Sequence, residues 1–132
     1  SHLYRNIYSG RIENLCAELP TYDLILMCDV IEHLAKDDGI GVVRHFLSAG
    51  SNLVVSTPRE FFQQALYESP DERHLSYWAP ADFRPLAAWM DWQTIDSGRL
   101  YVLSPRKLDI RGFGRSPIKR LRRIARALRN EL

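Results

Sequence analysis

The chain has 132 residues, of which 45% are hydrophobic and 26% charged, and its formal net charge is +2. This composition is typical of one globular domain with a single core, and it excludes collagen, low-complexity disorder and a disulfide scaffold. No apolar run approaches the roughly 20 residues that span a bilayer, and the first residues do not have the order of a signal peptide. We therefore expect a soluble, cytoplasmic protein with no transmembrane segment.

The small net charge hides a strong asymmetry along the chain. Residues 1–105 hold 8 basic and 14 acidic residues, a net charge of −6, and residues 106–132 hold 10 basic and 2 acidic ones, a net charge of +8. An acidic body with a basic tail suggests contact with a polyanion or an acidic partner. The two cysteines fit neither a metal knuckle nor a set of bridges, so we expect no disulfide, and we expect Cys28 to be buried.

The first half of the chain alternates strand and helix signals. Residues 3–9 are typical of a short strand that ends at a turn, and residues 11–19 of a short helix closed by Pro20. Residues 22–28 contain five consecutive apolar residues after Asp23, which predicts a strand buried on both faces, as in a parallel sheet.

The next elements predict a parallel crossover. Asp37 and Asp38 can cap a helix that runs to Leu47, with Gly50 as its C-terminal glycine. Residues 52–58 predict a second buried strand, stopped by proline. A strand, a helix and a strand with short connections form a right-handed parallel unit.

The last part of the body predicts a helix and a hairpin. The helix begins at Pro80 and continues to about Met90, and strands at residues 93–96 and 99–103 flank a turn at Ser97 and Gly98. Trp89 and Trp92 are expected in the core.

From Pro105 the composition changes. Residues 105–117 predict a linker and residues 118–132 a basic amphipathic helix. Its arginines either bind nucleic acid or an anionic membrane, or remain solvated while its apolar side packs on the body or on a partner.

The most informative residues directly follow the strand at 22–28. Asp29, Glu32 and His33 lie within five consecutive residues beyond the carboxyl end of a strand. Open parallel sheets bind their ligands at that place. Histidine is also the side chain most easily poised for proton transfer near neutral pH. Position and chemistry together predict a functional site.

The same stretch resembles a known family, the class I S-adenosylmethionine-dependent methyltransferases. Their fourth strand often has an aromatic residue and Asp-Leu-Ile, followed by Asp-Val-Ile-Glu-His-Leu, as residues 22–34 have here. Residues 52–58 resemble the fifth strand with its Ser-Thr-Pro exit, residues 74–83 the entry into the next helix, and residues 93–103 the terminal antiparallel hairpin. The resemblance covers about residues 4–104 and implies an incomplete Rossmann-like α/β domain, a parallel sheet with helices on both faces that ends in a β-hairpin.

The resemblance also implies a cofactor site. The backbone of Cys28, Asp29 and Val30 would lie beside the methionine moiety of S-adenosylmethionine, with His33 close to it. A methyl group would pass to an O or N acceptor mainly by positioning, and His33 or His74 would assist in removing the proton, with Glu32 beside them. In another interpretation His33 only fixes the loop through the backbone, and Glu32 only caps the turn.

At the adenine end this chain departs from the family. Gly10, Arg11 and Ile12 would follow the third strand, where the family usually has an acid that accepts a hydrogen bond from the adenine amino group. A guanidinium only donates, so Arg11 cannot replace it. Either Glu13 takes the role, or the backbone alone holds the adenine, or the contact is weak.

The Gly-x-Gly-x-Gly loop of the family and the first two strands have no counterpart in the sequence. We therefore expect the C-terminal portion of a methyltransferase domain in residues 1–104, either truncated or a natural remnant. The uncovered sheet would need a homo-oligomer, another partner or a further segment. A non-catalytic remnant that acts as an interaction module is the alternative.

The acceptor is the least determined part. The long segment after Pro58 has the length of a lid or binding loop, or it packs its aromatics on the body. Its candidate substrate-binding residues are Thr57, Arg59, Tyr77 and Trp78, with Phe61, Phe62 and Tyr67 as further lining.

A rival hypothesis concerns a metal. Asp29, Glu32, His33 and His74 resemble the metal-binding set of methyltransferases that modify the terminal 2'-hydroxyl of small RNAs, and mixed carboxylate and imidazole sets suit divalent ions. That family usually has Glu in place of Asp29, and metal-free relatives share the motif, so our prediction assigns no metal ligands.

Overall fold

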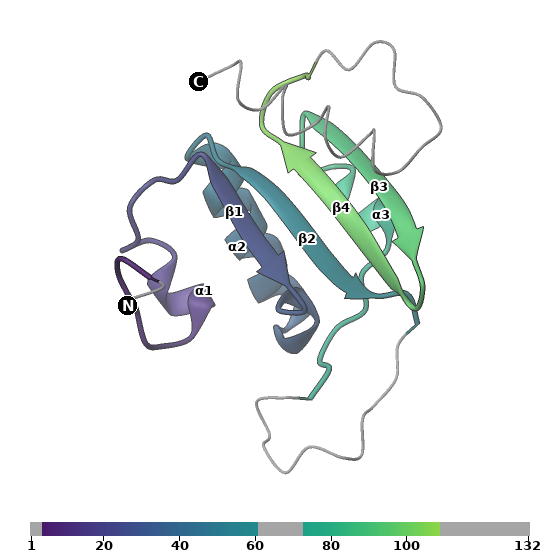
Figure 1. Ribbon diagram of the computed structural model, residues 1–132, viewed down its shortest axis with the longest axis horizontal. Coiled ribbons are helices and arrows are strands. Elements are labelled where there is room, and N and C mark those ends of the chain that lie inside the picture. Colours follow the sequence, from purple (N-terminus) through teal and green to yellow (C-terminus); the bar gives the residue numbers. More distant parts are fainter. Residues whose placement is uncertain (1–3, 61–72, 109–132) are drawn as a thin grey trace.

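A computed structural model describes residues 4–60 and 73–108 of the chain (Figure 1). The expected linker beyond residue 108, the amphipathic helix at 118–132 and the aromatics at 61, 62 and 67 lie outside these residues. In the described part, no helix is both long and apolar enough to span a membrane.

The described residues form an α/β unit around a mixed sheet of four strands. These are β1 (Leu24–Cys28), β2 (Asn52–Pro58), β3 (Trp89–Ile95) and β4 (Gly98–Ser104), in the order β1-β2-β4-β3. β1 and β2 are parallel, and β4 is antiparallel to both β2 and β3. The predicted parallel pair and terminal hairpin are thus confirmed.

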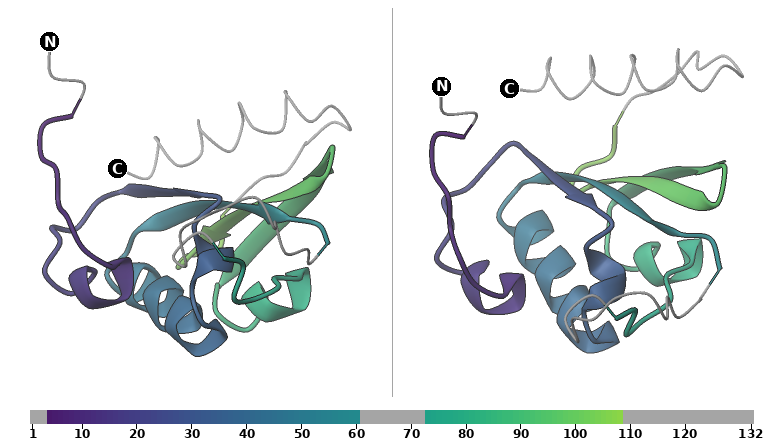
Figure 2. Two further views of the ribbon diagram at one scale, coloured as in Figure 1. Left: turned by 90° about the horizontal axis from the view of Figure 1, so that it is seen from below. Right: turned by 60° about the horizontal axis from the view of Figure 1, so that its bottom comes forward.

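The helices of the described residues lie on one face of this sheet (Figure 2), so the predicted helices on both faces are not seen in this part of the chain. They are α1 (Ile12–Leu15), α2 (Lys36–Ser48) and α3 (Pro80–Phe83), with the 3-10 turn η1 (Ile31–His33) after β1. α2 joins β1 to β2 as predicted, but Ala35 is its N-cap, and both aspartates lie in the first turn. Gly50 has φ of 93° just after the helix end, the left-handed conformation that suits glycine there.

The core lies between the helices and the sheet. α2 contributes Val43, Phe46 and Leu47, and the sheet contributes Met27, Leu53, Val55, Tyr101 and Leu103. An aromatic stack joins the two layers, because Trp78 stacks on Phe83 at 5.0 Å and Phe83 contacts Tyr101 at 4.5 Å between ring centroids.

The prediction that β1 is buried on both faces is wrong. Met27 is only 3% exposed, whereas Leu24 and Leu26 are 45% and 65% exposed, and Cys28 is also exposed. The physical reason is that β1 is the end strand and the described helices cover a single face. Cys16 and Cys28 are both free thiols.

Two predictions for the N-terminal part also differ from the structure: a predicted strand is absent among the described residues, and a predicted helix is shorter. Residues 4–9 form no strand and are all exposed, because among the described residues no neighbouring strand satisfies their backbone groups. The helix expected over residues 11–19 is one turn, Ile12–Leu15, followed by a further turn.

The helix expected from Pro80 to Met90 ends at Phe83, and Trp89 and Met90 belong to β3. Pro85 lacks a backbone N–H and so cannot donate the next hydrogen bond of the helix, which explains the early end after the C-cap Arg84. The hairpin turn is Asp96 and Ser97, one residue earlier than expected, with Asp96 at φ of 48°. Trp92 is exposed rather than in the core, because β3 is the other end strand.

Candidate functional site

The site begins where β1 and β2 end side by side. Asp29 follows β1 with φ of 53°, a left-handed conformation that aspartate tolerates better than most residues. Its backbone N–H donates to the carbonyl of Ser56 (3.2 Å) and to Ser56 Oγ (3.1 Å), and that hydroxyl donates to Asp29 Oδ1 (3.1 Å). The sharp exit from β1 is therefore fixed to β2.

The turn η1 then carries Glu32 into the interior. Its carbonyl oxygen accepts hydrogen bonds from the backbone N–H groups of Leu75 (2.7 Å) and Ser76 (3.1 Å). These bonds attach the segment 74–78 to the turn, although the two are far apart in the sequence.

A second set of bonds secures the same junction. Ile31 O accepts from Ser76 Oγ (3.3 Å) and from Trp78 Nε1 (3.2 Å), and the same indole N–H also donates to Ser76 Oγ (2.7 Å). Backbone and buried side chains together hold His74 beside the turn.

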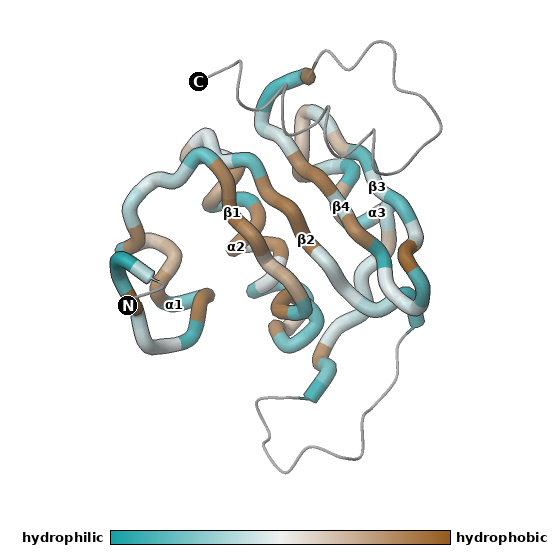
Figure 3. Tube along the Cα trace, viewed as in Figure 1, coloured by the Kyte–Doolittle hydropathy of each residue, from teal (hydrophilic) through white to brown (hydrophobic). Residues whose placement is uncertain are grey.

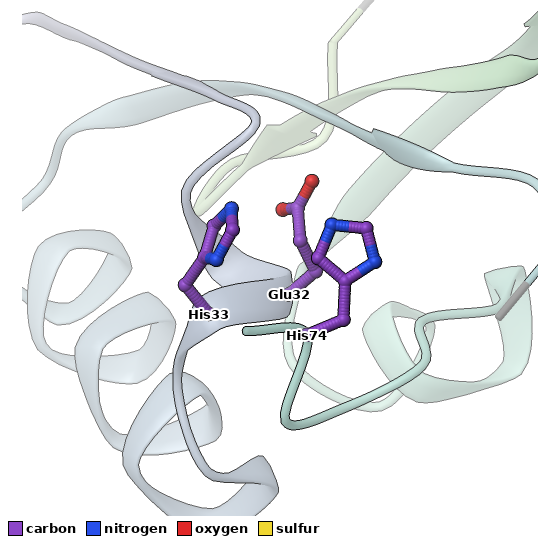
Figure 4. A group of neighbouring side chains, drawn as sticks. All are labelled: Glu32, His33 and His74. Carbon is purple, nitrogen blue, oxygen red and sulfur yellow. The ribbon is translucent and has the colours of Figure 1, made fainter. Parts of the chain in front are cut away.

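Both histidines lie at this junction. His33 Nδ1 donates to the carbonyl oxygen of Arg73 (3.2 Å), so in the neutral ring Nε2 is the nitrogen that carries the lone pair. The His33 and His74 rings meet edge to face, with centroids 5.1 Å apart. Figure 4 shows Glu32 between the two imidazoles in that view.

Glu32 is the most unusual of the three side chains. It is 2% exposed, and Oε2 has no hydrogen-bond partner among the described residues. Burial raises the pKa of the carboxyl, a backbone hydrogen bond opposes the rise, the negative charge of Asp29 adds to it, and His33 opposes it. The net direction is upward, so Glu32 holds its proton more tightly than an exposed glutamate does.

Glu32, His33 and His74 are also the described residues that can hold a metal. Each offers one ligand atom, and these atoms all lie within 4.8 Å of one another. Asp29, the fourth residue of the rival hypothesis, is not in this group. Its carboxylate instead accepts the Ser56 hydroxyl.

A shallow depression, which does not enclose room for a water molecule, lies beside this cluster. It is lined by Glu32, Thr57, Pro58, Glu60, His74, Ser76 and Tyr77. Two of the four residues predicted to bind the acceptor therefore line it, Thr57 and Tyr77.

The other two lie elsewhere. Trp78 is fully buried and therefore belongs to the core, where it anchors the segment 74–78. Lys36 Nζ lies 3.9 Å from the centre of its ring. Arg59 is exposed and forms an ion pair with Glu60 (3.2 Å).

The residues expected at the adenine do not follow a strand. Gly10 belongs to the exposed N-terminal segment, Arg11 is the N-cap of α1 and Ile12 its first residue. Arg11 forms an ion pair with Glu13. Desolvation raises the pKa of the Glu13 carboxyl, but the hydrogen bond and the charge of Arg11 outweigh it, so the net pKa is lowered. Glu13 is thus already paired.

Several residues of the site were missed. Ser56, Ser76 and Arg99 were not singled out, and Arg99 Nη1 donates to the Tyr77 hydroxyl (2.8 Å) and to Trp78 O (3.3 Å). The hydropathy of the segment 74–78 gave no sign that it belongs to the site. Its polar residues His74 and Ser76 are buried, whereas Leu75 and Tyr77 are exposed. Only the polar break at Ser56 inside an apolar strand was a readable signal.

Comparison with known proteins adds no assignment. No protein-family model matches the chain, and no match is found among the curated proteins.

Proposed function

We propose that the chain belongs to a class I S-adenosylmethionine-dependent methyltransferase and transfers the methyl group to an O or N acceptor. The observation that carries this proposal is the cluster of Glu32, His33 and His74 beside the turn at Asp29, where two parallel strands end. Ligands of open α/β sheets bind at that edge. The terminal hairpin, with β4 antiparallel to β2, agrees with the order of elements that the resemblance implies.

The cofactor would lie against the turn after β1. The family resemblance assigns the backbone of Cys28, Asp29 and Val30 to the methionine moiety, and the bonds between Asp29 and Ser56 hold this turn in one conformation. A fixed turn loses little entropy when it binds a ligand. The residues of this turn therefore fit the role, whereas the paired Arg11 and Glu13 give no support for an adenine contact.

The acceptor would lie at the surface depression lined by Thr57, Tyr77 and His74, whose side chains would move apart to admit it. When bound, S-adenosylmethionine would supply the methyl group from its sulfonium sulfur, which would keep the electron pair of the bond that breaks. The acceptor atom forms the new bond and loses its proton. His33 Nε2 or His74 accepts that proton, and the buried Glu32 stabilises the positive charge that the imidazole gains.

A titration of the ¹⁵N-labelled chain with S-adenosylmethionine tests the cofactor site by NMR. We expect selective amide shifts at residues 28–33, and the same shifts with S-adenosylhomocysteine. Adenosine alone serves as the control, because it lacks the methionine moiety, and should leave these amides unchanged.

Unchanged amides at residues 28–33 in saturating S-adenosylmethionine would contradict the proposal. The interaction module would then be the better interpretation, and salt-sensitive binding to a polyanion such as heparin would support it.

A further inference from the structure

Arg99 lies near the start of β4, beside the candidate site. Its register partner on β2 is Thr57, and side chains paired across antiparallel strands share one face of the sheet. This is the face toward the helices, since Tyr101, two residues further along β4, lies in the core. We propose that Arg99 and Tyr77 bind the carboxylate group of a small molecule at the depression where β2 ends.

The guanidinium of Arg99 carries a positive charge that no carboxylate offsets among the described residues. Nη1 donates to two neutral oxygens, the Tyr77 hydroxyl (2.8 Å) and Trp78 O (3.3 Å). The neighbouring Arg59, by contrast, is ion-paired with Glu60 (3.2 Å). An anion that reaches Arg99 would therefore meet a cation whose charge is not yet neutralised.

The hydrogen-bond donors of this group also exceed the acceptors around it. Nε of Arg99 is buried without a partner, and Nη2 donates to no residue in the part of the chain that the structure describes. The Tyr77 hydroxyl accepts from Nη1, so its own proton is left to donate. Nη2 and this hydroxyl are adjacent donors, and a group with two acceptor oxygens would satisfy both.

The charge at the site favours a carboxylate over a phosphate. One guanidinium offers one positive charge, which a carboxylate balances, whereas a phosphate group carries about −1.5 to −2 at neutral pH. A carboxylate also holds its two oxygens in one plane, as a guanidinium holds its donors. Two acids line the same depression, but Arg59 offsets the charge of Glu60, and burial raises the pKa of Glu32.

Tyr77 joins Arg99 to the depression. Its side chain is 40% exposed and lines the depression together with Thr57 and His74. A carboxylate held by Arg99 and Tyr77 would direct the rest of the molecule toward His74, one of the two proposed proton acceptors. The methyl acceptor would then be a carboxylic acid with a separate O or N nucleophile. This last step rests on the proposed function, whereas the binding of the carboxylate does not.

An NMR titration of the full ¹⁵N-labelled chain with sodium benzoate tests the site. Benzamide has the same shape without the charge and is the matched control ligand. We expect benzoate to shift the amides of Tyr77 and Arg99 and the Nε–H resonance of Arg99, and benzamide to leave them unchanged. Sodium phosphate at the same ionic strength should bind more weakly than benzoate.

Variants separate the two donors from the charge. The affinity for benzoate should fall at least about tenfold in Arg99→Gln and about threefold in Tyr77→Phe, which keeps the ring. Arg99→Lys keeps the charge but not the planar guanidinium, so its affinity should lie between those of Arg99→Gln and the parent. Arg44→Gln is the matched control: Arg44 is exposed on α2 and does not line the depression, so this variant should bind benzoate as the parent does.

Circular dichroism shows whether each variant is folded, because Arg99 also donates to Trp78 O. If Arg99→Gln does not fold, two other measurements decide the question. They are the affinity of Tyr77→Phe and the shift of the Arg99 Nε–H resonance in the parent.

Equal affinities in the parent, Arg99→Gln and Tyr77→Phe would overturn the inference, as would equal shifts from benzamide or tighter binding of phosphate. Arg99 would then only hold Tyr77 and Trp78 in place. Benzoate binding with no amide shift from S-adenosylmethionine at residues 28–33 would support the carboxylate site and contradict the methyltransferase proposal. Those shifts without benzoate binding would overturn the carboxylate site and leave the proposed function standing, so the two failures are distinguishable.

Discussion

Asp29 combines a strained backbone with a site position. Its φ of 53° costs most residues about 1–2 kcal/mol, and β-branched residues are the least suited to it. Asp29→Asn keeps both the conformation and an oxygen that accepts the Ser56 hydroxyl, whereas Asp29→Val keeps neither. We expect Asp29→Val to lower the free energy of unfolding by about 1–3 kcal/mol in urea denaturation and Asp29→Asn to change it by less than about 0.5 kcal/mol.

The same pair also separates the backbone from the carboxylate in cofactor binding. If the cofactor contacts the backbone of the turn, Asp29→Asn should bind S-adenosylmethionine within about threefold of the parent, and Asp29→Val at least about tenfold more weakly, as RT ln 10 is about 1.4 kcal/mol. A loss in Asp29→Asn as large as in Asp29→Val would instead assign the binding to the negative charge.

Tyr101 makes the free energy of unfolding depend on pH in the alkaline range. Burial raises the pKa of its hydroxyl, Arg99 opposes this, and Tyr77 and Asp82 add to it. Because the folded pKa is above the unfolded value of about 10, the folded state holds this proton more tightly. Its stabilising contribution is complete below pH about 10 and is lost as the pH rises through the folded pKa.

Tyr101→Phe removes that proton. At pH 7 we expect a loss of about 0.5–1.5 kcal/mol, since the hydroxyl lies 3.4 Å from Trp78 O. Between pH 9 and 11 the difference between parent and variant in urea denaturation should shrink or change sign. Parallel curves over this range would show that Tyr101 does not titrate abnormally.

At the scale of elements, α2 approaches the segment 74–78 at Gly39. A Cβ there would lie 2.5 Å from Cζ2 of Trp78, whereas one at Gly41 on the same helix meets nothing within 4 Å. Alanine favours a helix over glycine by about 1 kcal/mol, so the two substitutions differ only in packing.

We therefore expect Gly41→Ala to raise the free energy of unfolding by about 0.5–1 kcal/mol and Gly39→Ala to lower it by about 1–3 kcal/mol. Thermal and urea denaturation measure both. Gly39→Ala should also shift the indole N–H resonance of Trp78, which donates to Ile31 O. Stabilisation by both substitutions would mean that the ring moves away freely.

The elements that the sequence predicted well are those determined by local patterns. Five apolar residues after Asp23, a glycine after a periodic helix and a proline after an apolar strand are signals within a few residues, and β1, α2 and β2 followed. The errors came from features that depend on neighbours. The segment at residues 4–9 had strand composition but no partner strand among the residues that the structure describes. For α3, the apolar spacing beyond Phe83 outweighed the signal of Pro85.

For the candidate site, too, local patterns were readable in the sequence and long-range contacts were not. Asp29, Glu32 and His33 lie on one short stretch after a strand, so their position was readable. The junction with His74 depends on bonds between Glu32 O and the backbone of residues 75–76, which no local pattern encodes. The resemblance implied a role for His74, and only the fold shows that its ring lies 5.1 Å from that of His33.

In the part of the chain that the structure describes, helices cover only one face of the sheet. Hydrophobic residues run along β1, β2 and β4 (Figure 3), yet the described helices lie on one face of the sheet. Side chains on a strand alternate between faces, so adjacent residues on β1 report on opposite faces. Met27 faces the helices and is 3% exposed, whereas Leu26 is 65% exposed.

Alanine at these two adjacent positions therefore measures how much each face contributes. Met27→Ala should lower the free energy of unfolding by about 2–5 kcal/mol, the usual cost of a cavity in a core, and Leu26→Ala by less than about 0.5 kcal/mol. Urea denaturation at two protein concentrations measures both. A large loss in Leu26→Ala would show that the second face is covered after all. If that loss grows with protein concentration, another copy of the chain covers the face, because association stabilises the folded state by mass action. If it does not, a segment of the same chain does.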